Sequence, residues 1–158
     1  MLLKNFGVPS GKLWKFNFRM DYGHQGGKNM FEKFDVSLPV IKDIMFDIRD
    51  YGAVGDGVTS NTQMFKDAIC AAAECGGRVL VPDGIWLTGP IELLSGVELH
   101  LSDNALITFS KNKEEYPLIV TDYEGIKRIR TQSMIYADNA KDIAITGKGT
   151  IDGNGHKW

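Results

Sequence analysis

The clearest pattern along the chain is a series of short apolar and polar alternations in its second half. From Arg78 onward, runs of about four or five residues rich in Val, Ile and Leu are bounded by Gly, Pro, Asp, Ser or Asn. Such runs are typical of short β-strands. The expected strands are 78–81, 85–88, 91–93, 97–101, 106–109, 134–137, 143–146 and 149–153. The chain is therefore expected to be mostly β.

One segment has helical periodicity instead. Apolar residues between 64 and 73 recur about every fourth position, with Phe65 and Ile69 on one face. Ser60 followed by Gln63 is typical of a capping box, and the glycines at 76 and 77 favour helix termination. We expect one amphipathic helix over 60–75.

Three apolar triplets favour a repeated turn. They begin at Ile85, Ile91 and Val97, six residues apart, which raises a hexapeptide β-helix as a possibility. The spacing does not continue, because a charged excursion occupies residues 111–132 before the strand pattern resumes. Periodicity alone therefore leaves a sandwich, a barrel and a solenoid open.

The N-terminal part of the chain differs in composition from the rest. Residues 1–44 are rich in Lys, Phe, Met and Gly and are interpreted as a leader or extension, with the ordered body at 45–158. The body opens with Asp50–Gly57, whose three glycines predict an irregular turn with positive φ angles. This turn does not match GxGxxG, and no GK[ST] follows, so we expect no phosphate site.

Charge and cysteine content limit the partners and cofactors. A formal charge of −2 gives no electrostatic reason to expect nucleic acid or an anionic membrane. Cys70 and Cys75 are predicted to be buried thiols, without metal or cofactor spacing. Two unpaired thiols favour a reducing compartment, while the start of the chain lacks the pattern of a signal peptide. Localisation stays open between the cytoplasm and export by a signal outside this sequence.

Three segments, in this order and spacing, resemble the start of glycoside hydrolase family 28, the polygalacturonases. They are Asp50–Thr62, Gly76–Pro90 and Ile143–Gly153, and the resemblance covers 46–158, which is 113 of 158 residues. The first two are shared across the wider pectate-lyase-like superfamily, and the third is more characteristic of the hydrolases. The resemblance implies a right-handed parallel β-helix. Residues 45–158 would be its N-terminal coils, cut off before the later coils, and the helix would cap the first coil.

Within such a coil, strand alternation assigns side chains to the two faces. Val97, Leu99 and Leu101 would point into the bore, while Glu98 and His100 would face outward. We expect His100 to be a solvated residue of the outer face.

The resemblance implies inverting hydrolysis of galacturonate-containing pectic chains by a pair of aspartates. In the family these fall in Asn-Thr-Asp and Asp-Asp motifs, followed by Gly-His-Gly and Arg-Ile-Lys. Here Asn61-Thr62-Gln63, Gly23-His24-Gln25 and Arg128-Ile129-Arg130 each depart from those motifs. No catalytic, cofactor-binding or metal-binding residue is therefore assigned. The expected partner is a pectic polysaccharide or oligogalacturonide.

Other polar residues have a structural interpretation beside a functional one. Asp56 and Asp152 are expected to bond turn amides. His156 and Trp158 are interpreted as loop packing residues, with stacking on a sugar as the alternative. The basic run Lys127–Arg130 is expected to be solvated, although it could attract an acidic polysaccharide. Two other functions stay open, namely a non-catalytic structural or carbohydrate-binding β-helix and a lyase-like or epimerase-like relative.

Overall fold

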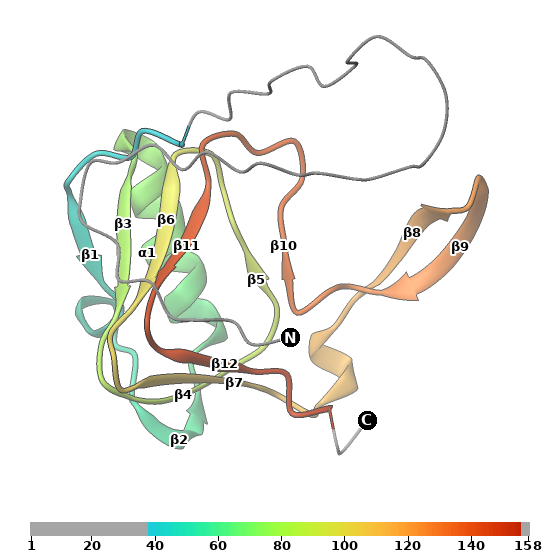
Figure 1. Cartoon of the computed structure of the whole chain (residues 1–158). Helices are drawn as coiled ribbons and strands as arrows, with labels where there is room; N and C mark the ends of the chain where they lie inside the picture. The colour runs from blue at the N-terminus through green and yellow to red at the C-terminus, as the bar shows by residue number, and fades with distance from the viewer. Residues whose placement is uncertain (1–37, 156–158) are drawn as a thin grey trace, which may run out of the picture. The chain divides into compact units, whose positions relative to one another are not determined.

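The strands wind into a right-handed parallel β-helix whose coils stack upon one another, as the family resemblance implied (Figure 1). The computed structural model describes residues 38–155, which lie in one compact unit. The strands of the coil are β1 (Met45–Asp47), β2 (Asp56–Ser60), β3 (Gly77–Val81), β4 (Gly84–Thr88), β5 (Ile91–Glu92), β6 (Val97–Leu101), β7 (Ala105–Phe109), β10 (Ile135–Tyr136), β11 (Ala144–Gly147) and β12 (Thr150–Asp152).

Three parallel sheets form the faces of the coil. The first has the order β1-β3-β6-β11, the second β2-β4-β7-β12 and the third β5-β10. The apolar triplets that begin at Ile85, Ile91 and Val97 coincide with β4, β5 and β6, respectively. These three strands form successive faces of one turn of the coil. The triplets' spacing of six residues is therefore the distance along the chain between successive faces of this one turn. The hexapeptide β-helix raised as a possibility is not formed, because the register repeats after twenty residues.

The register between coils shows why this spacing does not continue. Arg78 pairs with Glu98, twenty residues later, whereas Glu98 pairs with Ala144, 46 residues later. The longer turn contains a 3₁₀ helix, η2 (Lys113–Glu115), and an antiparallel hairpin of β8 (Leu118–Tyr123) and β9 (Ile126–Thr131). Figure 1 shows this hairpin extending away from the coil. The sequence predicted only a charged excursion here.

Inward-facing apolar side chains fill the bore of the coil. Val97 and Leu99 are fully buried and Leu101 is 2% exposed, so the predicted inner face of β6 is confirmed. Leu99 is in register with Val79 of the preceding coil and Ile145 of the next. Burial of such side chains from water is the main favourable term in folding.

The capping helix, α1 (Thr62–Cys75), covers the first coil and contacts β1, β3 and β5. Its apolar face buries Phe65 and Ile69, which are 1% and 2% exposed. A solenoid whose terminal coil is uncovered exposes an apolar cross-section to water, and α1 closes that cross-section here. The predicted plug is confirmed.

The expected capping box at Ser60 is wrong. Ser60 ends β2, and the helix begins at Thr62 with Asn61 at the N-cap and no side-chain cap bond. Gln63 donates to Asp67 Oδ1 at 2.7 Å instead of reaching back toward the cap. The reason is that Asn61 is fully buried and its amide serves other backbone groups. It donates to the carbonyl oxygens of Val54, Thr59 and Leu87 and accepts from Val54 N.

The glycine-rich turn combines positive φ angles with a close contact. It follows the 3₁₀ helix η1 (Ile48–Tyr51), and Gly52 and Gly57 have φ of +87° and +74°. At Gly55 an added Cβ would lie 2.9 Å from the ring of Trp86, so only glycine fits there. Trp86 is itself buried and donates from Nε1 to Pro82 O at 2.7 Å. The turn is structural, as expected.

The expectation of two buried thiols fails at Cys70. This side chain is exposed, whereas Cys75 is half-buried. Cys70 follows Ile69, and one residue is a rotation of about 100° around the helix, which moves its side chain off the buried face. Both cysteines are free thiols.

Tyr116 anchors the base of the hairpin. It is 3% exposed, and its hydroxyl donates to Ser110 O at 2.8 Å. Burial raises the pKa of Tyr116 to about 12, and the neighbouring Glu115 charge adds to the rise. The folded chain therefore holds this proton at pH values where an unfolded tyrosine loses it.

We expect the free energy of unfolding to fall as pH rises from 10 toward 12, because the unfolded state binds fewer protons in that window. Tyr116→Phe should make this fall shallower by up to about 1.4 kcal/mol per pH unit. Urea unfolding at several alkaline pH values measures both slopes. Identical slopes for the wild-type and variant chains would contradict the assignment.

We expect Phe65→Ala to lower the free energy of unfolding by about 3–5 kcal/mol, because a large cavity opens under the cap. Cys70→Ala, on an exposed position of the same helix, is the matched control and should change it by less than about 0.5 kcal/mol. Urea denaturation monitored by circular dichroism gives both values. Similar losses for the two variants would show that α1 does not plug the coil through Phe65.

Candidate functional site: a groove beside the capping helix

An open groove of about 250 Å³ lies between the start of α1 and the β5–β10 face of the coil. Its apolar lining comes from Phe65 and Ile69 of the helix and from Ile91 and Leu94 beside β5. Its polar lining is given by Thr62, Gln63, Lys66, Glu92 and Tyr136. The groove is thus formed where the capping helix α1 lies beside the sheet of β5 and β10.

Glu92 and Tyr136 form the wall of the groove that belongs to the coil. They pair in register between β5 and β10, and the Tyr136 hydroxyl donates to Glu92 Oε2 at 3.1 Å. Burial raises the pKa of Tyr136, and the charge of Glu92 raises it further. The tyrosine therefore stays a neutral hydrogen-bonding group at ordinary pH.

The helix supplies the opposite wall. Lys66 is exposed there and brings a positive charge, while Thr62 Oγ1 accepts a hydrogen bond from Gly89 N at 2.7 Å. A ring face, an ammonium group and several hydroxyl or amide groups suit a polar ligand such as an acidic sugar. Among the described residues, Glu92 is the carboxylate that lines the groove. The arrangement fits the binding of a polar ligand.

A second polar cluster lies on the outer face of the first sheet. Glu98 Oε2 is 3.1 Å from Arg78 Nε, and its other oxygen accepts a hydrogen bond from Thr146. Thr146 Oγ1 is in turn 2.6 Å from His100 Nδ1. The cluster joins three successive coils through β3, β6 and β11. It is a cross-strand ladder that ties the coils together.

The expectation that His100 is a solvated residue needs correction, and Glu98 of the same strand is also shielded from solvent. Both lie on the outer face as predicted, but Glu98 is only 7% exposed, and His100 is half-buried and hydrogen-bonded to Thr146. Burial tends to raise the pKa of Glu98, yet the hydrogen bond from Thr146 and the ion pair with Arg78 outweigh it and hold that pKa below its usual value. The partners come from other coils, so local sequence does not reveal them.

The two aspartates interpreted as turn residues have that role. Asp152 Oδ1 accepts from Asn154 N at 2.8 Å. Asp56 Oδ1 accepts from Thr59 N and Val58 N, and these bonds lower the pKa of Asp56. Both carboxylates satisfy backbone amides of their own turns.

The other candidates lie apart from the groove or outside the described residues. Lys127, Arg128 and Arg130 are exposed on β9 of the hairpin. His156 and Trp158 lie outside the described residues, as do Gly23-His24-Gln25 and most of the expected leader.

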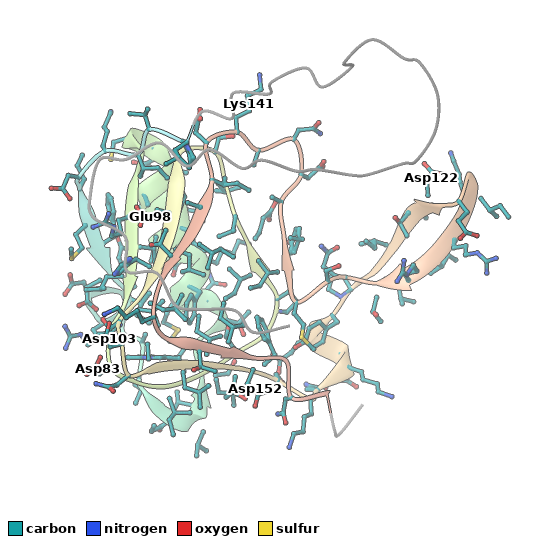
Figure 2. The ribbon with its side chains drawn as sticks, viewed as in Figure 1. Asp83, Glu98, Asp103, Asp122, Lys141 and Asp152 are labelled. Atoms are coloured by element: carbon teal, nitrogen blue, oxygen red, sulfur yellow. The ribbon has the colours of Figure 1, made fainter. Side chains whose placement is uncertain are left out.

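The acidic side chains are dispersed over the coil. Figure 2 shows Asp83 and Asp103 at the corner between the first two sheets, Glu98 on the outer face and Asp122 near the tip of the hairpin. Between residues 38 and 155, His, Cys, Asp and Glu side chains form no group of three able to hold a metal ion. Over the same described span, no helix is long and apolar enough to cross a membrane.

Comparison with known proteins shows which family and which solved structures the chain is similar to. Residues 45–155 match the family described as Rhamnogalacturonase A/epimerase, pectate lyase-like. An exo-poly-alpha-D-galacturonosidase of Dickeya chrysanthemi is 32% identical over 96% of this chain and 26% of its own length. The crystal structure of a hyperthermoactive exopolygalacturonase from Thermotoga maritima is 41% identical, with a TM-score of 0.68, over 75% of this chain and 27% of that chain.

A relative named for a binding function is also similar. The plasmin and fibronectin-binding protein A of Streptococcus pneumoniae is 37% identical over 72% of this chain and 16% of its own length. The chain thus spans about a quarter or less of the length of these relatives.

We expect Glu98→Gln to lower the free energy of unfolding at pH 7 by about 1–3 kcal/mol, because Arg78 loses its oppositely charged partner and Thr146 its charged acceptor. The pKa of Glu98 is lowered by folding, so its stabilisation is present above its usual pKa of 4.5 and is lost as pH falls below it. The difference between variant and wild type should therefore shrink in acid. Urea unfolding at several pH values measures it.

Glu114→Gln, at an exposed position of η2, is the control and should change stability by less than about 0.5 kcal/mol. A Glu98→Gln chain as stable as wild type at neutral pH would show that the ladder on the outer face contributes little.

Proposed function

Since the chain belongs to the Rhamnogalacturonase A/epimerase, pectate lyase-like family, we propose that it forms the N-terminal coils of a polygalacturonase-type glycoside hydrolase. The reaction proposed is inverting hydrolysis of galacturonate-containing pectic polysaccharide. The observation that carries the proposal is that likeness to exopolygalacturonases, in both sequence and coil geometry, extends over most of the described residues. Residues 45–158 are then the first part of one β-helix domain, preceded by an extension at 1–44.

The coil that contains β11 and β12 supports this proposal. Ile145 and Ile151 continue the inward ladders of Leu99 and Ile107, but they are 46% and 38% exposed, whereas the residues beneath them are fully buried. Exposed apolar ladder positions are covered when another coil stacks on them. This is the surface on which the further coils of a longer β-helix would stack.

Each part of the chain has a role in this proposal. α1 closes the first coil, and the ladder joining Arg78, Glu98 and Thr146 holds the coils in register. The groove beside α1 binds a sugar residue through the ring of Tyr136 and the ammonium group of Lys66. The catalytic acid and base would come from other coils, because the four catalytic and binding motifs of the hydrolases do not occur in this sequence.

A binding function is the second candidate. It is favoured by the similarity to a streptococcal protein named for binding plasmin and fibronectin. In that case the coils would hold a ligand without cleaving it.

We expect the gene product at its full encoded length to release reducing ends from polygalacturonate, with inversion at the new anomeric carbon. The 158-residue chain at equal concentration should release none, because loss of an acid or base alone removes about 10²–10⁴ in rate. A reducing-sugar assay measures turnover, and proton NMR of the first product identifies the anomer.

Tight binding of polygalacturonate by the full-length product without turnover would favour the binding function. An unsaturated product would indicate a lyase. Turnover by the 158-residue chain would mean that carboxylates assigned to turns, Asp152 first among them, form an active site.

A further inference from the structure

The β8–β9 hairpin leaves a group of apolar side chains exposed. Leu118, Val120 and Ile129 are 70%, 69% and 71% exposed. Val120 pairs with Ile129 across the hairpin, and Leu118 is two residues from Val120 on the same strand, so the three side chains share one face. This group is called the apolar face below. The alternate residues of β8, Ile119 and Thr121, are half-buried, so the opposite face is better shielded from solvent.

The hairpin has little support from the rest of the fold. β8 and β9 pair with each other and, between residues 38 and 155, with no other strand. A two-stranded hairpin is marginally stable in water unless another element packs against it. Removal of three adjacent aliphatic side chains from water would stabilise it. The apolar face is therefore a surface on which a further group is expected to pack.

The chain that follows β12 returns to the base of this hairpin. Asn154 Nδ2 donates to the carbonyl oxygen of Phe109, the residue at which β7 ends before the hairpin, at 3.2 Å. A Cβ added to Gly153 would lie 3.3 Å from Sδ of Met134, which stands between β9 and β10. In Figure 1 the chain leaves β12 toward the same corner. The two residues after β12 thus contact the chain on both sides of the hairpin.

The segment that starts at His156 carries a side chain suited to the apolar face. Trp158 comes four residues after Asn154, and an extended chain of that length spans up to about 13 Å. The apolar face begins at Leu118, two residues after Tyr116, whose hydroxyl bonds to the backbone of this corner. An indole ring buries about 150–250 Å² when it packs, which suits a face of three aliphatic side chains.

The small size of the apolar face favours an occupant from the same chain. A stable complex with a separate molecule buries about 1,200 Å² or more in total, which three aliphatic side chains do not supply. A segment of the same chain is already attached near the hairpin, so its effective concentration is high and a small contact suffices.

We infer that the chain from His156 onward docks on the apolar face, with the indole of Trp158 packed against it. The contact holds the hairpin to the start of the next turn of the coil. It assigns Trp158 to packing and not to stacking on a sugar. The contact is independent of the substrate and of the reaction proposed above.

The test is the accessibility of a thiol placed on the apolar face of the 158-residue chain by Val120→Cys. Alkylation by iodoacetamide is followed for each thiol separately by peptide mass spectrometry, and the exposed Cys70 on α1 is the internal standard. Relative to Cys70, the introduced thiol should react at least about fivefold more slowly in Val120→Cys than in Val120→Cys with Trp158→Ala, because docking hides it.

Arg128→Cys is the matched control. Arg128 is exposed and pairs with Thr121, so it lies on the opposite face of the hairpin. Addition of Trp158→Ala should change the rate at this thiol by less than about twofold, because the indole does not cover that face. Unchanged melting temperatures establish that each variant is folded.

Equal rates at position 120 with and without Trp158 would overturn the inference. An equal increase in Arg128→Cys would also overturn it, because loosening of the whole hairpin would then explain both rates. Protection that rises with protein concentration would show that a second copy covers the apolar face. Protection found only in the gene product at its full encoded length would assign the cover to later coils, and both results reject docking of Trp158.

Discussion

The constraint on which the structure depends is the in-register stacking of inward-facing side chains from coil to coil. Leu99 is buried because Val79 lies in the coil before it and Ile145 in the coil after it. Each coil must return to the same three faces for this contact to form. Three other features support this stacking. The capping helix closes the first coil, the tight glycine turn shapes it, and the outer polar ladder holds the neighbouring coils in place.

Sequence reasoning succeeded where a single strand or helix determines its own pattern. The inner positions of β6 were predicted because alternation of period two is a local property. It missed β2, whose residues Asp56–Ser60 include one large apolar side chain, and it missed the hairpin, whose alternation is obscured by charged residues. The capping box failed because Ser60 and Gln63 fit a local motif while the buried amide of Asn61 holds the local backbone differently.

The site was harder to predict than the fold. The groove brings Lys66 together with Tyr136, seventy residues away, and Glu98 is buried by Arg78 and Thr146 from two other coils. Such contacts depend on the length of each turn, which alternation does not give. The order and spacing of three sequence segments indicated the family. The catalytic motifs of that family are absent from the sequence, so no catalytic residue was assigned. Neither observation could indicate which residues of the hairpin lie opposite one another, because that follows from the pairing register of β8 and β9.

The unequal lengths of successive turns have a consequence for how such proteins change. One turn returns after twenty residues and the next after 46, yet Leu99 still meets both neighbours. Extra residues at a corner between faces thus leave the register of the coil intact, and a corner can gain or lose a whole hairpin in one genetic event. A single residue added within β6 would instead exchange its inner and outer faces. The corners of the coil are therefore where new ligand contacts can arise in evolution while the stacked core is preserved.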